Sequence, residues 1–180
     1  IIVTGSDGGI KWAKEIAKVF CDNGISCLAV AYWKEKNLPK YLSLIPIEII
    51  AIAADYLKDK GYTKIGIYGF LKGAELALLS ASYFPQISFV IAVSPACCVF
   101  EGIRKQKYSK TSSWTYKGEP LPFVSFEGIK TSFIKNLIKY REVGFARQYC
   151  TALSKNKNED NTIKVENINA PILLISAEND

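Results

Sequence analysis

The sequence predicts an α/β protein in which a mostly parallel sheet has helices on both faces. Short apolar, β-branched runs alternate with helical patterns along the chain. The runs are continuously hydrophobic, which is typical of parallel strands buried on both faces. The 180 residues, 49% of them hydrophobic and 22% charged, are enough for one core. We therefore expect a single three-layer domain over residues 1–180.

The order of the elements follows from these patterns. Five apolar runs are expected to form strands: 1–4, 27–31, 65–68, 89–94 and 172–176. Three helical patterns fall between them: 10–22, 47–60 and 72–84. The second pattern begins after Pro46 and ends at Gly61, which is where helices commonly start and stop. Ligands of such open sheets bind at the carboxyl ends of the strands, so functional residues are expected there.

The stretch 95–170 interrupts the alternation. It contains helical patterns over 132–140 and 143–153 and a polar loop over 155–161. We expect it to be a helical insertion that lies over the carboxyl edge of the sheet as a lid. The chain starts without Met on a strand-like run, so we also expect a piece of a longer protein, incomplete at both ends.

The most informative motif is Gly69-Phe70-Leu71-Lys72-Gly73. A buried strand precedes it and a helix follows, which is the layout of a nucleophile elbow. The glycines at 69 and 73 are needed because side chains there would collide with strand and helix. We expect Leu71 to adopt a strained backbone conformation. A working hydrolase has Ser, Cys or Asp at this position, whereas Leu cannot attack a carbonyl. An ordinary glycine-rich turn is the alternative interpretation.

A second glycine-rich turn, Gly5-Ser6-Asp7-Gly8-Gly9, joins the first strand to the first helix. Its backbone N–H groups can stabilise an oxyanion or bind a phosphate. Residues Thr4 to Ile10 also nearly fit the fingerprint of a short-chain dehydrogenase. Lys11 stands where that fingerprint requires its final glycine, however. Tyr56 and Lys60 have the dehydrogenase's catalytic spacing but come too early in the chain.

Composition narrows the possible functions. The chain has no histidine, so it holds no His base and no His-ligated metal, and the cysteines show no metal spacing. The net charge of +6 suits an anionic ligand, but the lysines are dispersed, so nucleic-acid binding is not predicted. No apolar run reaches the ~18–20 residues that span a bilayer. The five cysteines are expected to be reduced core residues of a cytoplasmic protein: Cys21, Cys27, Cys97, Cys98 and Cys150.

Several segments together carry a resemblance to a known family: Gly5-Ser6-Asp7-Gly8-Gly9, Leu28-Ala29-Val30-Ala31-Tyr32 with Leu38-Pro39-Lys40, Ile65 to Glu75, Ser94-Pro95-Ala96-Cys97-Cys98, Ser113-Trp114-Thr115-Tyr116-Lys117-Gly118 with Leu121-Pro122, and Pro171 to Ala177. Over essentially all of its length the chain resembles the carboxyl-terminal catalytic domain of the acyl-CoA thioesterase and bile acid-CoA:amino acid N-acyltransferase family. The Ser-Trp-Thr-Tyr segment and the lysine after the centre of the elbow are the more specific features.

The resemblance implies an α/β-hydrolase fold and a Ser or Cys nucleophile that an acyl-CoA thioester acylates. Water releases the acid in thioesterases, an amino acid accepts the acyl group in transferases, and no cofactor is implied. By position, Leu71 corresponds to the nucleophile and Asp180 to the triad acid. The main-chain N–H of Lys72, with a second donor from the turn around Asp7 and Gly8, would form the oxyanion hole.

Two hypotheses follow from the resemblance. The first is an acyl-CoA thioester hydrolase or acyltransferase domain with an altered nucleophile. The second is a non-catalytic homologue that binds an acyl-CoA or a protein partner. Leu71 and the lack of histidine predict that this polypeptide itself is inactive. We expect Asp180 at the same edge of the sheet as Leu71, with room for an imidazole between them. Acyl chain length, acceptor and oligomeric state stay open.

Overall fold

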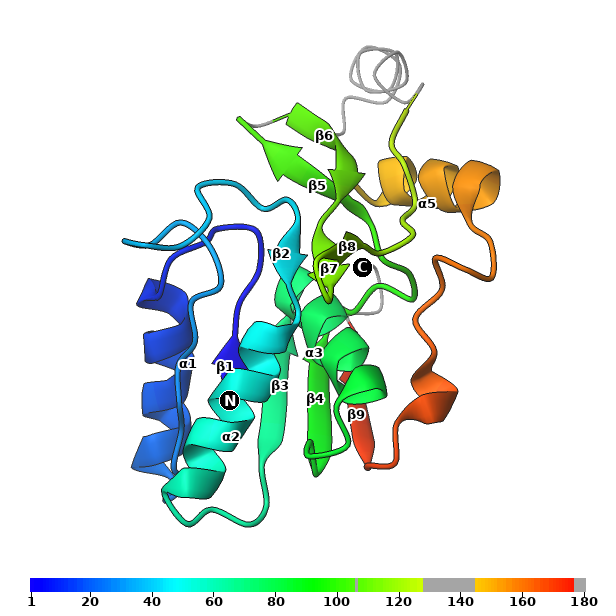
Figure 1. Ribbon diagram of the computed structural model, residues 1–180. Coiled ribbons are helices and arrows are strands. Elements are labelled where there is room, and N and C mark those ends of the chain that lie inside the picture. Colours follow the sequence, from blue (N-terminus) through cyan, green and yellow to red (C-terminus); the bar gives the residue numbers. More distant parts are fainter. Residues whose placement is uncertain (106, 128–144, 177–180) are drawn as a thin grey trace.

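The computed structural model describes residues 1–105, 107–127 and 145–176, and every structural statement below concerns these residues. The central sheet has four parallel strands in the spatial order β1 (Ile2–Val3), β3 (Gly66–Phe70), β4 (Phe89–Val93) and β9 (Ile172–Ile175). The helices are α1 (Lys11–Asp22), α2 (Glu48–Asp59), α3 (Lys72–Tyr83) and α5 (Phe145–Asn156), with a short 3-10 helix, η1 (Val165–Asn167). The expected α/β architecture with a mostly parallel sheet is confirmed (Figure 1).

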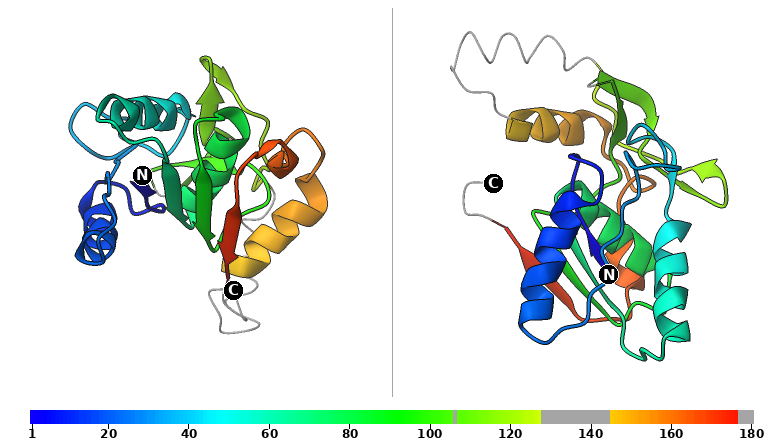
Figure 2. Two further views of the ribbon diagram at one scale, coloured as in Figure 1. Left: turned by 90° about the horizontal axis from the view of Figure 1, so that it is seen from below. Right: turned by 90° about the vertical axis from the view of Figure 1, so that its left-hand side faces the viewer.

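The helices are divided between the two sides of the sheet, with α1 on one side and α2 and α3 on the other (Figure 2). The main core lies between the sheet and α3, and its residues Ile67, Val90 and Ala92 are fully or almost fully buried. On the other side α1 packs over β1 and β3, and the ring of Phe20 lies 5.6 Å from that of Tyr68. Within the described residues, β9 is much less covered than β3 and β4, and Leu174 is 60% exposed.

The expectation of a strand over residues 27–31 needs correction. Residues 27–31 form no regular strand but a single parallel bridge between Ala29 and Ile2. The backbone still pairs with β1, because Ile2 N donates to Leu28 O and Val30 N donates to Ile2 O. On this edge of β1 the pairing is limited to Ile2, whereas on its other edge both residues of β1 pair with β3.

The insertion was expected to be helical, and its described first part is instead built from short strands. They are β5 (Glu101–Arg104), β6 (Lys107–Ser112), β7 (Trp114–Tyr116) and β8 (Glu119–Pro120). Strands β5 and β6 pair with each other, while β7 pairs with β8 and with β2 (Ile45–Pro46), a strand that was also not expected. These strands are short and β6 is largely polar, so they lack the apolar runs by which the central strands were identified. The helical pattern over 132–140 lies outside the described residues, and the pattern over 143–153 corresponds to α5.

The insertion lies where it was expected. Strands β5 and β6 and helix α5 are beyond the carboxyl ends of the central strands, at the end of the sheet where α3 begins (Figure 1). A separate small core holds this part together, with Phe100 and Phe126 stacked at 5.4 Å and Tyr149 of α5 against both rings. The insertion therefore borders the edge at which a ligand of this sheet would bind.

Candidate active site

The backbone at Leu71 is strained as the sequence predicts. Leu71 joins β3 to α3 with φ 51° and ψ −114°, a region that residues with a side chain rarely adopt. Its N–H donates to Val93 O at 2.9 Å, which fixes the turn to the end of the neighbouring strand. Such a conformation costs about 1–3 kcal/mol and persists only where the surroundings enforce it. Its side chain is 42% exposed at the carboxyl edge of the sheet.

The two glycines of the motif are required by close packing. A Cβ on Gly69 would overlap the carbonyl oxygen of Gly73 and lie 2.6 Å from Ala74 Cα. A Cβ on Gly73 would lie 2.6 Å from Thr4 O. Because these neighbours are backbone atoms, they cannot move aside as a flexible side chain would. The steric reason inferred from the sequence is thus confirmed, and strand, turn and helix are in direct contact.

The second glycine-rich turn lies beside Leu71. A Cβ on Gly5 would be 3.3 Å from Leu71 Cβ, so the first residue of this turn touches the centre of the other. The Tyr32 hydroxyl donates to Thr4 O at 2.6 Å and lies 3.2 Å from Gly5 O, which anchors the start of the turn. Burial is the main reason why the pKa of Tyr32 lies far above its usual value. Two glycine turns that are far apart in sequence therefore meet at one edge of the sheet.

The backbone donors of this turn are partly committed to other groups. Gly9 N donates to Trp33 O, and Ile10 N donates to the Glu35 carboxylate, both at 3.0 Å. In the described turn, the N–H groups of Ser6, Asp7 and Gly8 are not among the donors of a backbone hydrogen bond, so they stay available for a ligand. The first N–H groups of α3, beginning at Lys72, likewise have no partner inside their helix. Gly5 is the residue of this turn that contacts Leu71, and Gly8 packs against Trp33 and Lys34, so the pairing of Asp7 or Gly8 with Lys72 in an oxyanion hole stays a prediction.

A buried ion pair lies directly below the turn, and the sequence analysis did not identify it. Lys72 Nζ contacts both carboxylate oxygens of Glu75, at 2.7 and 2.8 Å, and lies 3.4 Å from Phe100 O. The side chains are only 8% and 2% exposed. Burial lowers the pKa of the Lys72 ammonium group, and the negative charge of Glu75 opposes that shift.

Glu75 connects α3 to the insertion. Its carboxylate accepts from Trp114 Nε1 at 2.7 Å and from Phe100 N at 3.1 Å, in addition to Lys72. The Trp114 ring lies 5.5 Å from the ring of Tyr32, which anchors the other glycine turn. A fully buried glutamate in the otherwise apolar pattern 74–81 is a signal that could have been read from the sequence, since Glu is almost never buried unpaired.

Some predicted features lie elsewhere or cannot be placed. Asp180 is outside the described residues, so its position near Leu71 stays a prediction.

Cys21, Cys97 and Cys150 are exposed, so the expectation that the cysteines lie mostly in the core is wrong, although all five are free thiols. Cys21 and Cys150 lie within helices α1 and α5 and Cys97 lies between β4 and β5, so apolar sequence neighbours did not show which of these side chains face solvent. In the part of the chain that the structure describes, no cluster of three or more His, Cys, Asp or Glu could hold a metal, and no helix is long and apolar enough to cross a membrane.

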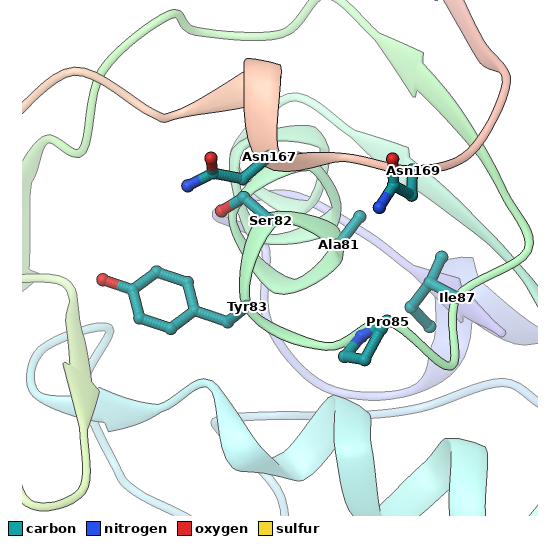
Figure 3. A pocket seen from close by; sticks show the side chains of 7 residues that line it. All are labelled: Ala81, Ser82, Tyr83, Pro85, Ile87, Asn167 and Asn169. Atoms are coloured by element: carbon teal, nitrogen blue, oxygen red, sulfur yellow. The ribbon is translucent and has the colours of Figure 1, made fainter.

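A pocket of about 80 Å³ lies at the other end of α3 (Figure 3). Tyr83, at the end of that helix, and the amides of Asn167 and Asn169 line it. Helix α3 has 12 residues, so this pocket is about 18 Å from Leu71 along the helix. Its size and its distance from the glycine turns separate it from the candidate active site.

The strained strand-to-helix turn at the carboxyl edge of a parallel sheet, with a glycine turn beside it, is consistent with an α/β-hydrolase-like fold. Residues 45–180 match the family described as "BAAT / Acyl-CoA thioester hydrolase C terminal". Because the match covers more than half of the chain, this chain belongs to that family.

Named relatives agree with this assignment. The chain is 24% identical to acyl-coenzyme A thioesterase 1 of Homo sapiens over 181 residues, which cover 98% of this chain and 38% of that protein. It is 30% identical over 115 residues to the peroxisomal succinyl-coenzyme A thioesterase of Mus musculus, covering 62% and 26% of the two chains. It is 26% identical over 171 residues to acyl-coenzyme A amino acid N-acyltransferase 1 of Mus musculus, covering 91% and 36%. The chain thus spans well under half the length of these relatives.

Proposed function

We propose that this chain is the acyl-transfer domain of an acyl-CoA thioester hydrolase or acyl-CoA:amino acid N-acyltransferase, with residue 71 at the nucleophile position. The observation that carries the proposal is the backbone of Leu71, with φ 51° and ψ −114° between two glycines that tolerate no side chain. A nucleophile on such a turn is exposed at the sheet edge, where a substrate can reach it. The family membership supplies the substrate class, an acyl-CoA thioester.

The proposed reaction is a two-step acyl transfer. A Ser or Cys at residue 71 would attack the thioester carbonyl, the C–S bond would break, and the CoA thiol would leave. The negative charge on the carbonyl oxygen would be stabilised by the N–H of Lys72 and by an N–H from Asp7 or Gly8. Asp180 would orient a histidine that takes the proton from residue 71 and gives it to the CoA thiolate, and these 180 residues contain no such histidine. Water or an amino acid would then accept the acyl group.

Leu71 removes the first step. A hydrocarbon side chain has no lone pair and no proton to give up, so no acyl-enzyme can form. The backbone donors are unaffected by this residue. We propose that the polypeptide with Leu71 retains the binding geometry of the site without its covalent chemistry.

A second candidate function rests on the same residue. Leu71 places an apolar side chain, 42% exposed, where a nucleophile would stand. The chain also carries a net charge of +6, which favours an anionic ligand such as the phosphates of CoA. This alternative is a non-catalytic protein that binds an acyl-CoA. For either function we propose a cytoplasmic location, because the five cysteines are free and a reducing compartment keeps them so.

Leu71→Cys tests the proposed function, because a Cys is nucleophilic enough to react without an adjacent base. Transfer of the acyl group to a Cys exchanges one thioester for another, so release of free CoA would be followed by chromatography at equal concentrations of chain and substrate. We expect up to one equivalent of CoA released rapidly by Leu71→Cys, and with Leu71 only the slow release due to the exposed native cysteines. Leu71→Ala is the matched control, since it keeps the native cysteines. Rapid turnover by the Leu71 chain, or equal rates for Leu71→Cys and Leu71→Ala, would contradict the proposal.

A further inference from the structure

Two adjacent thiols, Cys97 and Cys98, lie in the segment between β4 and β5. Their sulfur atoms are 3.6 Å apart. Cys97 is exposed and Cys98 is buried, so one thiol is open to solvent and the second lies directly behind it. No step of the proposed acyl transfer uses either sulfur.

The backbone around the pair is fixed by the segment that follows α5. Ile163 N donates to Cys97 O at 3.0 Å, and Val99 N donates to Asn161 O at 2.9 Å. The Cys98 sulfur lies 3.8 Å from the Thr162 hydroxyl. Because hydrogen bonds hold the chain on both sides of the pair, the two sulfur atoms are already in place before any ligand arrives.

The surroundings of the buried Cys98 thiol act on its pKa in opposite directions. Burial raises the pKa of Cys98 to about 11, so the free thiol keeps its proton at neutral pH. The Lys157 ammonium group and a hydrogen bond with Thr162 partly oppose this shift and favour the thiolate. A ligand atom that forms a covalent bond to sulfur takes the place of this proton, so the Cys98 sulfur stays uncharged in its buried position.

A bridging atom fits between these sulfurs better than a direct bond. A disulfide requires the sulfurs about 2.05 Å apart and the Cα atoms usually at least about 4.4 Å apart. Consecutive Cα atoms across a trans peptide are only about 3.8 Å apart. Closing the direct bond would thus distort the backbone, whereas the observed separation leaves room for one larger atom bound to both sulfurs.

We propose that Cys97 and Cys98 form a two-sulfur binding site for a thiophilic trivalent metalloid, of which an organic trivalent arsenical is the probe. Soft sulfur ligands select soft elements of this kind. With phenylarsine oxide, both S–H bonds break and two As–S bonds form. The two protons and the oxide oxygen leave together as water, and the arsenic stays trivalent, so no oxidant or reductant is needed.

The order of the two steps follows from exposure. Cys97 is accessible and captures the arsenical first. The second bond is intramolecular, because the Cys98 sulfur is already 3.6 Å away from the first. Preorganised second contacts of this kind raise the apparent affinity by about 10²–10⁴-fold over one contact.

The other cysteines provide the controls. Cys21 and Cys27 lie near enough to influence each other, since Cys21 contributes to the raised pKa of Cys27, which burial mainly causes. Cys150 is exposed on α5. The double variant C21S/C150S removes the two other exposed thiols and leaves Cys27 as a single, half-buried thiol.

The test is titration of the full chain with phenylarsine oxide, followed by intact-mass spectrometry. For C21S/C150S we expect one arsenical per chain that excess glutathione, a monothiol, does not remove and dithiothreitol, a dithiol, does. We expect C21S/C150S with C97S added to bind about 10²-fold more weakly, with the remaining adduct removed by glutathione. C97S changes an exposed residue, so circular dichroism should show an unchanged fold. Glutathione-resistant binding by this triple variant, or only glutathione-sensitive binding by C21S/C150S, would overturn the proposal.

Discussion

Leu71 and Lys72 are neighbours in sequence but differ in almost every physical respect. Leu71 has a strained backbone and a side chain that is 42% exposed, and the hydrogen bonds that define it involve only its backbone. Lys72 begins a regular helix, is buried, and pairs with Glu75. The contacts that fix the turn are thus made by its backbone and by the buried pair beneath it, and none of the hydrogen bonds uses the Leu71 side chain. If residue 71 is a nucleophile position as proposed, we expect Ser or Cys to fit there without changing the surrounding geometry.

The largest expected effect on stability comes from the buried pair Lys72–Glu75. Glu75→Ala would leave the Lys72 charge and the Trp114 N–H buried without their acceptor. Removing one partner of a buried ion pair costs about 3–5 kcal/mol. We expect the free energy of unfolding, measured in urea, to fall by that amount.

The exposed ion pair on α1 is the control for this prediction. Lys18 and Asp22 are joined at 2.9 Å but are 70% and 62% exposed. Asp22→Ala should therefore change the free energy of unfolding by less than about 1 kcal/mol. Similar losses for Glu75→Ala and Asp22→Ala would mean that the network does not support the turn.

The next largest effect concerns the glycine beneath the turn. In Gly73→Ala the new Cβ would lie 2.6 Å from Thr4 O and 2.8 Å from Val3 O. Overpacking against backbone atoms costs about 1–3 kcal/mol. We expect thermal unfolding to show a correspondingly lower melting temperature. An unchanged melting temperature would show that β1 and α3 are farther apart than the structure has them.

A smaller effect, of opposite sign, is expected at Leu71. In Leu71→Gly the strain of the positive φ is relieved, while some chain entropy is lost on folding. We expect the chain to become more stable by about 1 kcal/mol in urea unfolding. Ile52→Gly is the matched control, since Ile52 is an exposed apolar residue in the regular helix α2, where glycine should cost about 1 kcal/mol. Destabilisation in both variants would contradict the strained turn.

A further effect is a pH dependence near the network. Cys98 is two residues from Phe100, and burial raises its pKa from 9.0 to about 11. A group with a raised pKa in the folded state stabilises the fold below its unfolded value, and that stability is lost as the pH rises toward the folded value. Between about pH 9 and 11, unfolding free energies should therefore fall more steeply for the native chain than for C98S. Other groups titrate in both chains and cancel in the difference, so equal slopes would contradict this prediction.

The turn was predictable because its determinants are local. Gly69, Leu71 and Gly73 lie within five residues, and the strand and helix around them have clear apolar patterns. The network below the turn was not predictable in the same way, because Glu75 and Trp114 are 39 residues apart and meet only in the folded chain.

The sequence patterns also failed to identify the strands of the insertion. Its strands are short, and β6, with exposed Lys107 and Lys110, has none of the apolar continuity that marks the central strands. Strand β7 depends on pairing with β2, in which Ile45 is the partner of Trp114 although it lies 69 residues earlier in the chain. Local composition could not show this pairing. Local patterns thus identified the strained turn at the carboxyl edge of the sheet, whereas long-range pairing determines which elements support and cover it.

The most direct test of the account is to find where an acyl group goes. Leu71→Cys would be incubated with an acyl-CoA, digested, and analysed by mass spectrometry for acylated peptides, with the exposed Cys97 and Cys150 of the same chain as internal references. The proposed oxyanion donors at Lys72 and at Asp7 or Gly8 should accelerate transfer only to residue 71, by the order of 10²-fold expected for such donors. Preferential acylation of residue 71 is the result that the account predicts. Acylation of residue 71 at the same rate as Cys97 and Cys150 would contradict it.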